Sequence, residues 1–192
     1  MNEDQLIQGL IERNEQAFSH LVELYKHKVF NTCLSFTHNR EDAEEAVQDV
    51  FISVYQSIKA FQRKSSLSTW IYRITVNKSL EMVRKRRRKS QHGFINFILG
   101  RKADLPGTSQ VSFDHPGVQL ENMERTRILY DAIDGLAENQ RIAFTLHEFE
   151  GLSYKDIAGV MDASVSAVES LIFRAKKNLR EKLRGYYRDR DI

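Results

Sequence analysis

Residues 152–170 read LSYKDIAGVMDASVSAVES and encode two short helices separated by a tight turn. Ser153 and Ser164 stand where the two helices should begin, and serine is a preferred N-cap because its hydroxyl accepts from a free backbone N–H. Asp162 falls in the turn, where we expect a left-handed backbone, which aspartate tolerates better than most residues. Ala158 is small, as a close helix crossing requires. The spacing is typical of a helix-turn-helix, whose second helix enters the major groove of DNA.

The second helix of this motif should bury one stripe and leave its outer face for DNA. The predicted buried stripe is Val168, Leu171, Ile172, Ala175 and Leu179. Residues at the start of the helix would meet base edges, where Glu169 can accept from cytosine N4. The later cations Arg174, Lys176, Lys177 and Arg180 suit phosphate contacts. The candidate DNA contacts are Ser164, Ser166, Ala167, Glu169, Ser170, Phe173, Arg174 and Lys177. A three-helix bundle that only resembles the motif is the alternative.

The remaining sequence is also helical in its periodicity and contains few helix breakers, with 9 Gly and 2 Pro in 192 residues. Apolar spacing and caps predict helices over residues 15–36 behind Asn14, 40–58 behind Asn39, about 68–88, 120–136 and about 139–148. Cys33 lies in the first apolar stripe, so we expect a buried thiol and no internal disulfide. The sequence therefore predicts an all-α protein. It has two small helical domains, a helical bundle in residues 1–92 and a helix-turn-helix domain in 120–186, joined by a flexible linker over 93–119 and followed by a tail, 187–192.

The predicted linker contains turn signals at Pro106-Gly107 and at His115-Pro116-Gly117. It also contains an apolar patch, residues 94–99, that could form a short helix docking on another surface. The role of this patch is open at the level of sequence.

The net charge of +3 is modest, but its distribution is uneven. Residues 84–89 form an uninterrupted basic run, and residues 41–45 are mostly acidic. This asymmetry favours one polyanionic partner and a separate basic one, although two solvated faces would give the same pattern. The helix over 40–58 should bury Ala43, Val47, Val50, Val54 and Ile58 and point Glu45, Gln48 and Asp49 outward.

Aromatic and cationic side chains gather around the start of the third helix. Phe61, Trp70 and Tyr72 lie near a polar loop over residues 61–66, and Arg73, Asn77, Arg84 and Arg88 share a predicted polar face. Aromatics interleaved with cations suit unstacked bases and phosphates, because every base offers a π-face. Taken singly, Phe61 and Trp70 are more often core residues than nucleic-acid contacts.

Three stretches together resemble the extracytoplasmic-function (ECF, group IV) bacterial RNA polymerase sigma factors. Residues 61–77, FQRKSSLSTWIYRITVN, are similar to the segment of that family that melts and reads the −10 element. Residues 42–51, DAEEAVQDVF, resemble its polymerase-clamp-binding helix. Residues 136–183 resemble its −35-binding domain. The resemblance covers nearly the whole chain outside the linker, in the family's order and spacing.

The resemblance implies that Asp42, Glu45, Gln48 and Asp49 contact core RNA polymerase. It implies −10 DNA contacts from Phe61, Arg63, Lys64, Ser65, Ser66, Trp70, Arg73, Asn77, Lys78, Arg84 and Arg88, with the 61–66 loop holding an extruded base. The candidate DNA contacts of the helix-turn-helix would read the −35 element. Many relatives have a basic residue where this chain has Glu169, so an unusual −35 preference is expected. The implied partners are core RNA polymerase, through its β′ clamp and β flap, promoter DNA and an anti-sigma factor.

Other classes of protein fit the sequence less well. The N-terminus, MNEDQLIQGL, lacks the basic and apolar regions of a signal peptide, and no apolar run is long enough for membrane insertion, so a cytoplasmic protein is expected. The sequence contains no metal-ligand spacing and no phosphate-binding glycine loop, which argues against an enzyme and against a cofactor. The main rival is a helix-turn-helix regulator that acts without the polymerase.

Overall fold

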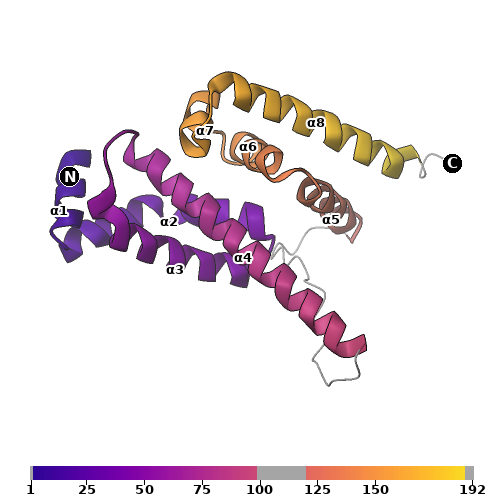
Figure 1. Cartoon of the computed structure of the whole chain (residues 1–192), viewed down its shortest axis with the longest axis horizontal. Helices are drawn as coiled ribbons and strands as arrows, with labels where there is room; N and C mark the ends of the chain where they lie inside the picture. The colour runs from indigo at the N-terminus through magenta and orange to yellow at the C-terminus, as the bar shows by residue number, and fades with distance from the viewer. Residues whose placement is uncertain (1, 99–119, 189–192) are drawn as a thin grey trace. The chain divides into compact units, whose positions relative to one another are not determined.

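The computed structural model describes residues 2–98 and 120–188, with side chains over 2–88 and 124–184. Helices make up both described parts, and no strand occurs within them. The chain divides into two compact units, one with the first four α-helices and one with the last four (Figure 1). The predicted all-α, two-domain fold is confirmed. Over the described residues, no helix combines the length and the apolar character needed to cross a membrane.

The first unit contains α1 (Glu3–Ile11), α2 (Glu15–Thr37), α3 (Arg40–Ser57), the 3₁₀ turn η1 (Ile58–Ala60) and α4 (Leu67–Ile98). Asparagine caps open its first three helices. Asn2, Asn14 and Asn39 each accept a hydrogen bond from the backbone N–H three residues on. Such a cap stabilises a helix by about 1 kcal/mol relative to alanine. The predicted starts of α2 and α3 are therefore confirmed, together with the physical reason for them.

Helix α1 was not predicted from the sequence. It begins with a capping box, in which Asn2 and Gln5 exchange side-chain and backbone hydrogen bonds of 2.8 and 3.1 Å. Its residues Leu6, Ile7 and Leu10 are buried in the core of the unit. The helix thus contributes three apolar side chains to the core of the first unit.

The core of the first unit lies between α1, α2, α3 and the start of α4. Its buried members include Leu21, Val29, Cys33, Val50 and Val54, each at most 2% exposed. Burying a side chain of leucine or valine size stabilises the fold by roughly 1.5–3 kcal/mol. Cys33 is buried, as predicted. The stripe predicted for α3 is also confirmed, except that Val47 is only half-buried.

Helix α4 is longer than the sequence predicted. It continues to Ile98, ten residues past the expected end at Arg88 and six residues into the predicted linker. Residues 94–98 of the apolar patch are therefore the end of α4 and not a separate short helix. Leu99 and the rest of the predicted linker, residues 99–119, lie outside the described residues.

The second unit contains α5 (Leu120–Asp134), α6 (Glu138–Glu148), α7 (Tyr154–Met161) and α8 (Val165–Arg188). Helix α8 includes residues 187 and 188, which the sequence assigned to the tail, whereas residues 189–192 are not described. Ile133, Leu136, Ala175 and Leu179 form one buried cluster between α5 and α8.

Two polar features fix the connections of α6. Arg141 is buried and pairs with Asp134 at 2.9 Å, which ties the start of α6 to the end of α5. After α6, Gly151 adopts φ +66°, a left-handed conformation that glycine adopts without a Cβ clash. The backbone N–H groups of Gly151 and Leu152 then donate to the carbonyls of His147 and Leu146. This turn delivers the chain to the cap of α7.

Candidate functional site

The outward face of α3 is acidic and polar, as the sequence predicted. Glu45, Gln48 and Asp49 are exposed. Ile52, which is not among the predicted contacts, is also 52% exposed. It follows Gln48 by four positions and Asp49 by three, the spacings that place helical side chains on one face. The face therefore combines charge with an apolar contact, which suits a protein partner more than DNA.

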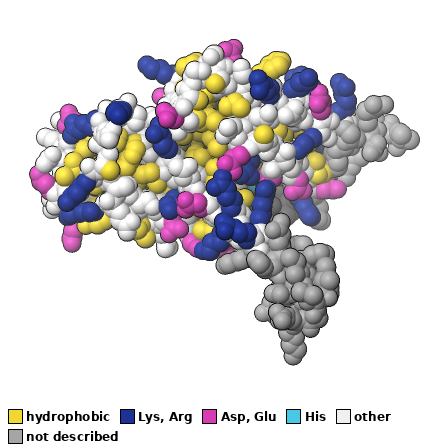
Figure 2. Space-filling model, in the orientation of Figure 1, with side chains coloured by type: hydrophobic (Ala, Val, Ile, Leu, Met, Phe, Trp, Pro, Cys, Tyr) yellow, Lys and Arg dark blue, Asp and Glu magenta, His cyan; other side chains and the backbone are white. Residues whose placement is uncertain are grey.

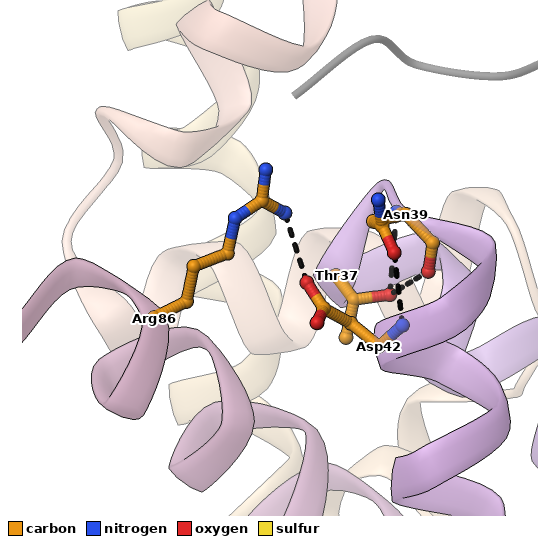
Figure 3. Close-up of polar contacts among 4 residues, drawn as sticks. All are labelled: Thr37, Asn39, Asp42 and Arg86. Carbon is orange, nitrogen blue, oxygen red and sulfur yellow. Dashed lines mark hydrogen bonds and ion pairs between the residues drawn. The ribbon is translucent and has the colours of Figure 1, made fainter. Parts of the chain in front are cut away.

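Asp42, the first of the predicted polymerase contacts, is more constrained than the other three. Its backbone N–H donates to the Asn39 side chain at 2.8 Å, and the Thr37 hydroxyl donates to the Asn39 carbonyl at 3.0 Å (Figure 3). Its carboxylate accepts a 2.9 Å hydrogen bond from Arg86 of α4, with the two side chains 26% and 34% exposed. Asp42 is therefore half-buried and already holds a cation of the chain itself.

A second ion pair joins the same two helices. Lys85 donates to Glu45 at 2.9 Å. The hydrogen bond and charge of Glu45 raise the pKa of Lys85, and the charges of Asp49 and Asp42 add to this effect. Figure 2 shows Lys and Arg side chains gathered beside Asp and Glu side chains where α3 and α4 run together. The basic run and the acidic segment, expected to serve separate partners, thus contact each other.

The 61–66 loop joins η1 to α4 and is partly anchored. Phe61 and Trp70 are half-buried against the core, with ring centroids 5.1 Å apart. Their reading as core residues is thus correct in part. Ser66 caps α4 by accepting from the Thr69 N–H at 3.1 Å, so the helix begins at Leu67. Lys64 and Ser66 are exposed, whereas Ser65 is half-buried.

Helix α1 reaches this loop with its acidic first turn. Asp4 pairs with Arg63 at 2.5 Å, although both side chains are more than half exposed. Arg63 itself has φ +54°, the left-handed region. The Glu3 carboxylate lies 3.4 Å from the backbone N–H of Leu67. The missed helix α1 therefore contributes directly to the surroundings of the predicted base-holding loop.

The polar face predicted along α4 is present but unevenly exposed. Asn77, Arg84 and Arg88 are exposed, whereas Arg73 and Lys78 are half-buried. Lys78 pairs with Glu81 of the same helix at 3.0 Å. Asn77, Arg84 and Arg88 are therefore the most accessible side chains of this face for a polyanion.

The helix-turn-helix has the predicted local geometry. Ser153 accepts from the Asp156 N–H and Ser164 from the Ala167 N–H, both at 3.2 Å. Asp162 has φ 53° and ψ 48°, the expected left-handed turn. Ala158 is buried. The caps and the turn residue are confirmed, and the burial of Ala158 agrees with its predicted inward position.

The outer face of α8 is exposed along its whole predicted length. Val168, Ile172, Ala175 and Leu179 are buried, and Leu171 is half-buried rather than buried. Phe173 is 70% exposed. Every candidate DNA contact is exposed, namely Ser164, Ser166, Ala167, Glu169, Ser170, Phe173, Arg174 and Lys177. An exposed face with two cations can lie in a groove without unfolding the motif.

One predicted phosphate contact of α8 is engaged within the chain. Lys176 pairs with Glu148 of α6 at 2.8 Å, and this hydrogen bond raises the pKa of Lys176. The Nδ1 atom of His147, beside Glu148, lies 3.1 Å from the Leu152 carbonyl oxygen, and its ring centroid lies 4.9 Å from that of Tyr154 with the two rings tilted by 59°. Lys176 therefore helps to join α8 to α6. Over the residues with described side chains, no cluster of three or more His, Cys, Asp or Glu is arranged to hold a metal ion.

Both units match known family models. Residues 21–89, from α2 to the basic run of α4, match the model described as sigma-70 region 2. Residues 126–179, from α5 to α8, match the model described as sigma-70, region 4. The two matches cover the acidic face of α3, the 61–66 loop and the helix-turn-helix.

Full-length relatives extend this similarity. The chain is 37% identical over 180 residues to an ECF RNA polymerase sigma-E factor of Haemophilus influenzae, covering 92% of this chain and 94% of the relative. It is 31% identical over 196 residues to the RNA polymerase sigma-H factor of Pseudomonas aeruginosa, covering 97% and 96% of the two chains.

Solved structures support the fold. CnrH, in complex with the cytosolic domain of CnrY, aligns with a TM-score of 0.67 at 21% identity, over 95% of this chain and 97% of CnrH. The sigma factor RpoE of Bartonella quintana, in complex with the anti-sigma factor NepR, aligns with a TM-score of 0.61 at 23% identity. That alignment covers 87% of this chain and 96% of RpoE.

Proposed function

Because the chain belongs to the ECF RNA polymerase sigma factors, initiation factors that bind core RNA polymerase, we propose that its three surfaces divide promoter recognition among them. One surface holds the polymerase, one holds the −10 element and one reads the −35 element. The observation that carries this proposal is the exposed acidic and polar face of α3. It lies on the same unit as a basic helix, where it would repel DNA, so a basic protein surface is the partner that it fits.

The polymerase contact is assigned to Asp42, Glu45, Gln48 and Asp49, which would meet basic residues of the β′ clamp. We add Ile52, whose exposed side chain extends the same face by one helical turn. Charge complementarity across such a face governs association rate and specificity, while a buried apolar residue slows dissociation. The second unit would meet the β flap.

The −10 contact is assigned to the 61–66 loop and to α4. An extruded base of the non-template strand would bind beside Phe61 and Trp70, with Arg63, Lys64, Ser65 and Ser66 around it. The phosphate backbone of the upstream −10 DNA would be held by Arg73, Asn77, Lys78, Arg84 and Arg88. Capturing an unstacked base stabilises the melted state by roughly 1–3 kcal/mol per stacked base, so opening needs no ATP hydrolysis.

The −35 contact is assigned to α8. Ser164, Ser166, Ala167, Glu169, Ser170 and Phe173 would face base edges, and Arg174 and Lys177 would face phosphates. The chemistry of Glu169 favours a cytosine opposite it. The exposure of all eight side chains supports this assignment.

The remaining parts of the proposal concern organisation and regulation. We assign residues 1–92 to polymerase binding and −10 recognition, 93–119 to a linker, 120–186 to −35 recognition and 187–192 to a tail, in a cytoplasmic factor of group IV. One relative, RpoE of Bartonella quintana, was solved with an anti-sigma factor, which supports a partner of that kind for this chain. No catalytic role is proposed. A helix-turn-helix regulator that works without the polymerase is not favoured, because sigma-70 region 2 matches residues 21–89.

The test is capture of core RNA polymerase by the purified chain, followed by binding of the complex to promoter DNA. We expect a stable complex that selects promoter fragments, since the acidic face of α3 is exposed and ready to dock. A chain that never captures core polymerase would overturn the proposal. A chain that binds duplex DNA specifically and ignores the polymerase would favour the rival regulator.

A further inference from the structure

Two cations of α4 are held by carboxylates that also belong to the proposed polymerase contact. Arg86 pairs with Asp42, and Lys85 pairs with Glu45, both at 2.9 Å. Lys85 and Arg86 lie inside the basic run, between the proposed DNA contacts Arg84 and Arg88. In the free protein these two cations pair with carboxylates of the proposed polymerase contact.

The two ion pairs have a defined geometry, and they can also be exchanged for pairs with external ions. The Asn39 cap holds the first turn of α3, so the Asp42 carboxylate faces Arg86 from a fixed position (Figure 3). Glu45 and Lys85 are each 54% exposed, and Asp42 and Arg86 are about one-third exposed or less. Ion pairs that are this accessible to water are weak, so an external ion can replace either partner at little cost.

We propose that Asp42 and Glu45 mask Lys85 and Arg86 from DNA in the free protein, and that docking on a basic polymerase surface releases them. Polymerase cations and α4 cations compete for the same two carboxylates. Capture of the polymerase by α3 therefore frees two α4 cations for phosphates and couples polymerase binding to upstream DNA binding. This inference rests on the proposed function of α3. By linkage, DNA that engages Lys85 and Arg86 also strengthens polymerase binding by the same factor.

The first arm of the test measures DNA binding without polymerase. The full-length Asp42→Asn/Glu45→Gln variant removes both masking charges and keeps the size of the side chains. We expect this variant to bind a nonspecific duplex more tightly than wild type. The slope of log affinity against log salt concentration should also be steeper by up to about two, since each added phosphate contact contributes about 0.9.

A matched variant, Glu12→Gln/Glu15→Gln, removes the same charge from two exposed residues, the C-cap of α1 and the first residue of α2. It controls for net charge, because it leaves the α3–α4 pairs in place. If both double variants bind DNA with the same affinity and slope, the masking proposal is overturned.

The second arm measures capture of core polymerase by the Lys85→Gln/Arg86→Gln variant. Removing the internal competitors should tighten capture by roughly 2- to 30-fold, the range given by two pairs of this exposure. Unchanged or weaker capture, with wild-type protein still binding the polymerase, would overturn the coupling and leave the proposed function standing. A wild-type chain that captures no polymerase overturns both, and the wild-type control makes that outcome recognisable.

Discussion

The Asp49→Lys substitution tests the polymerase contact at an exposed charge. Asp49 lies on the outer face of α3 with Glu45 one turn before it and Ile52 almost one turn after it. A carboxylate 4 Å from a cation near a protein surface interacts by about 4 kcal/mol at an effective dielectric of 20. Close charge pairs at interfaces couple by about 1.5–7 kcal/mol.

Exposure and salt favour the lower part of that range, so the expected loss is about 2–4 kcal/mol, or roughly 30- to 1,000-fold in affinity for core polymerase. The fold should survive, because Asp49 is exposed and lysine is a good helix former. The assay is a titration of labelled protein with core polymerase, with circular dichroism as the check on folding.

The matched control is Glu44→Lys, which makes the same charge change on the same helix. Glu44 is exposed, pairs with Arg40 within α3, and lies about 140° around the helix from Asp49. Its effect on capture should be several-fold smaller. Equal affinities for wild type and Asp49→Lys would refute the assignment of this face to the polymerase. Equal losses for the two variants would mean that overall charge, not this face, governs binding.

Four further outcomes follow from the site geometry. Glu169→Gln should change the −35 sequence recovered in a binding selection more than the overall affinity, and recovery of an identical sequence would exclude Glu169 as a base reader. Arg174→Ala and Lys177→Ala should each lower the salt slope of DNA binding by about one, and unchanged slopes would remove them from the phosphate contacts. Replacing residues 63–66 by glycines should suppress permanganate reactivity of thymines near the start site while −35 binding persists; normal reactivity would contradict base capture by the loop. Asp162→Val should lower the free energy of unfolding by about 1–2 kcal/mol in denaturant titration, whereas Asp162→Gly should be near neutral, because φ is 53° at that position; equal effects would contradict a strain-based role for this turn.

The elements that could be predicted are those with signals in the local sequence. Helices α2 and α3 follow the N-caps Asn14 and Asn39. In the helix-turn-helix, Ser153 and Asp162 are the N-cap and C-cap of α7, and Ser164 caps the start of α8. Caps, turn residues and apolar spacing act over three or four residues, so a single sequence contains them in full. Exposure of the α8 face followed from the same spacing.

The features that were missed have weak local signals or depend on tertiary contacts. Helix α1 is only nine residues long. Its capping box at Asn2 and Gln5 and its apolar residues are present in the sequence, but over so short a segment they are a weak signal for a helix. The extension of α4 to Ile98 passes through Gly93, a residue that usually weakens a helix. The pairs of Arg86 with Asp42 and of Arg63 with Asp4 join residues 44 and 59 positions apart. No spacing rule predicts them, because the packing of separate helices determines which charges meet.

Initiation by this chain is tested most directly by run-off transcription with core RNA polymerase on a library of promoter fragments, with and without the chain. Transcripts should start at discrete sites only when the chain is present, on fragments that share a −10 and a −35 element. Start sites that do not change when the chain is added to core polymerase would contradict a role in promoter recognition.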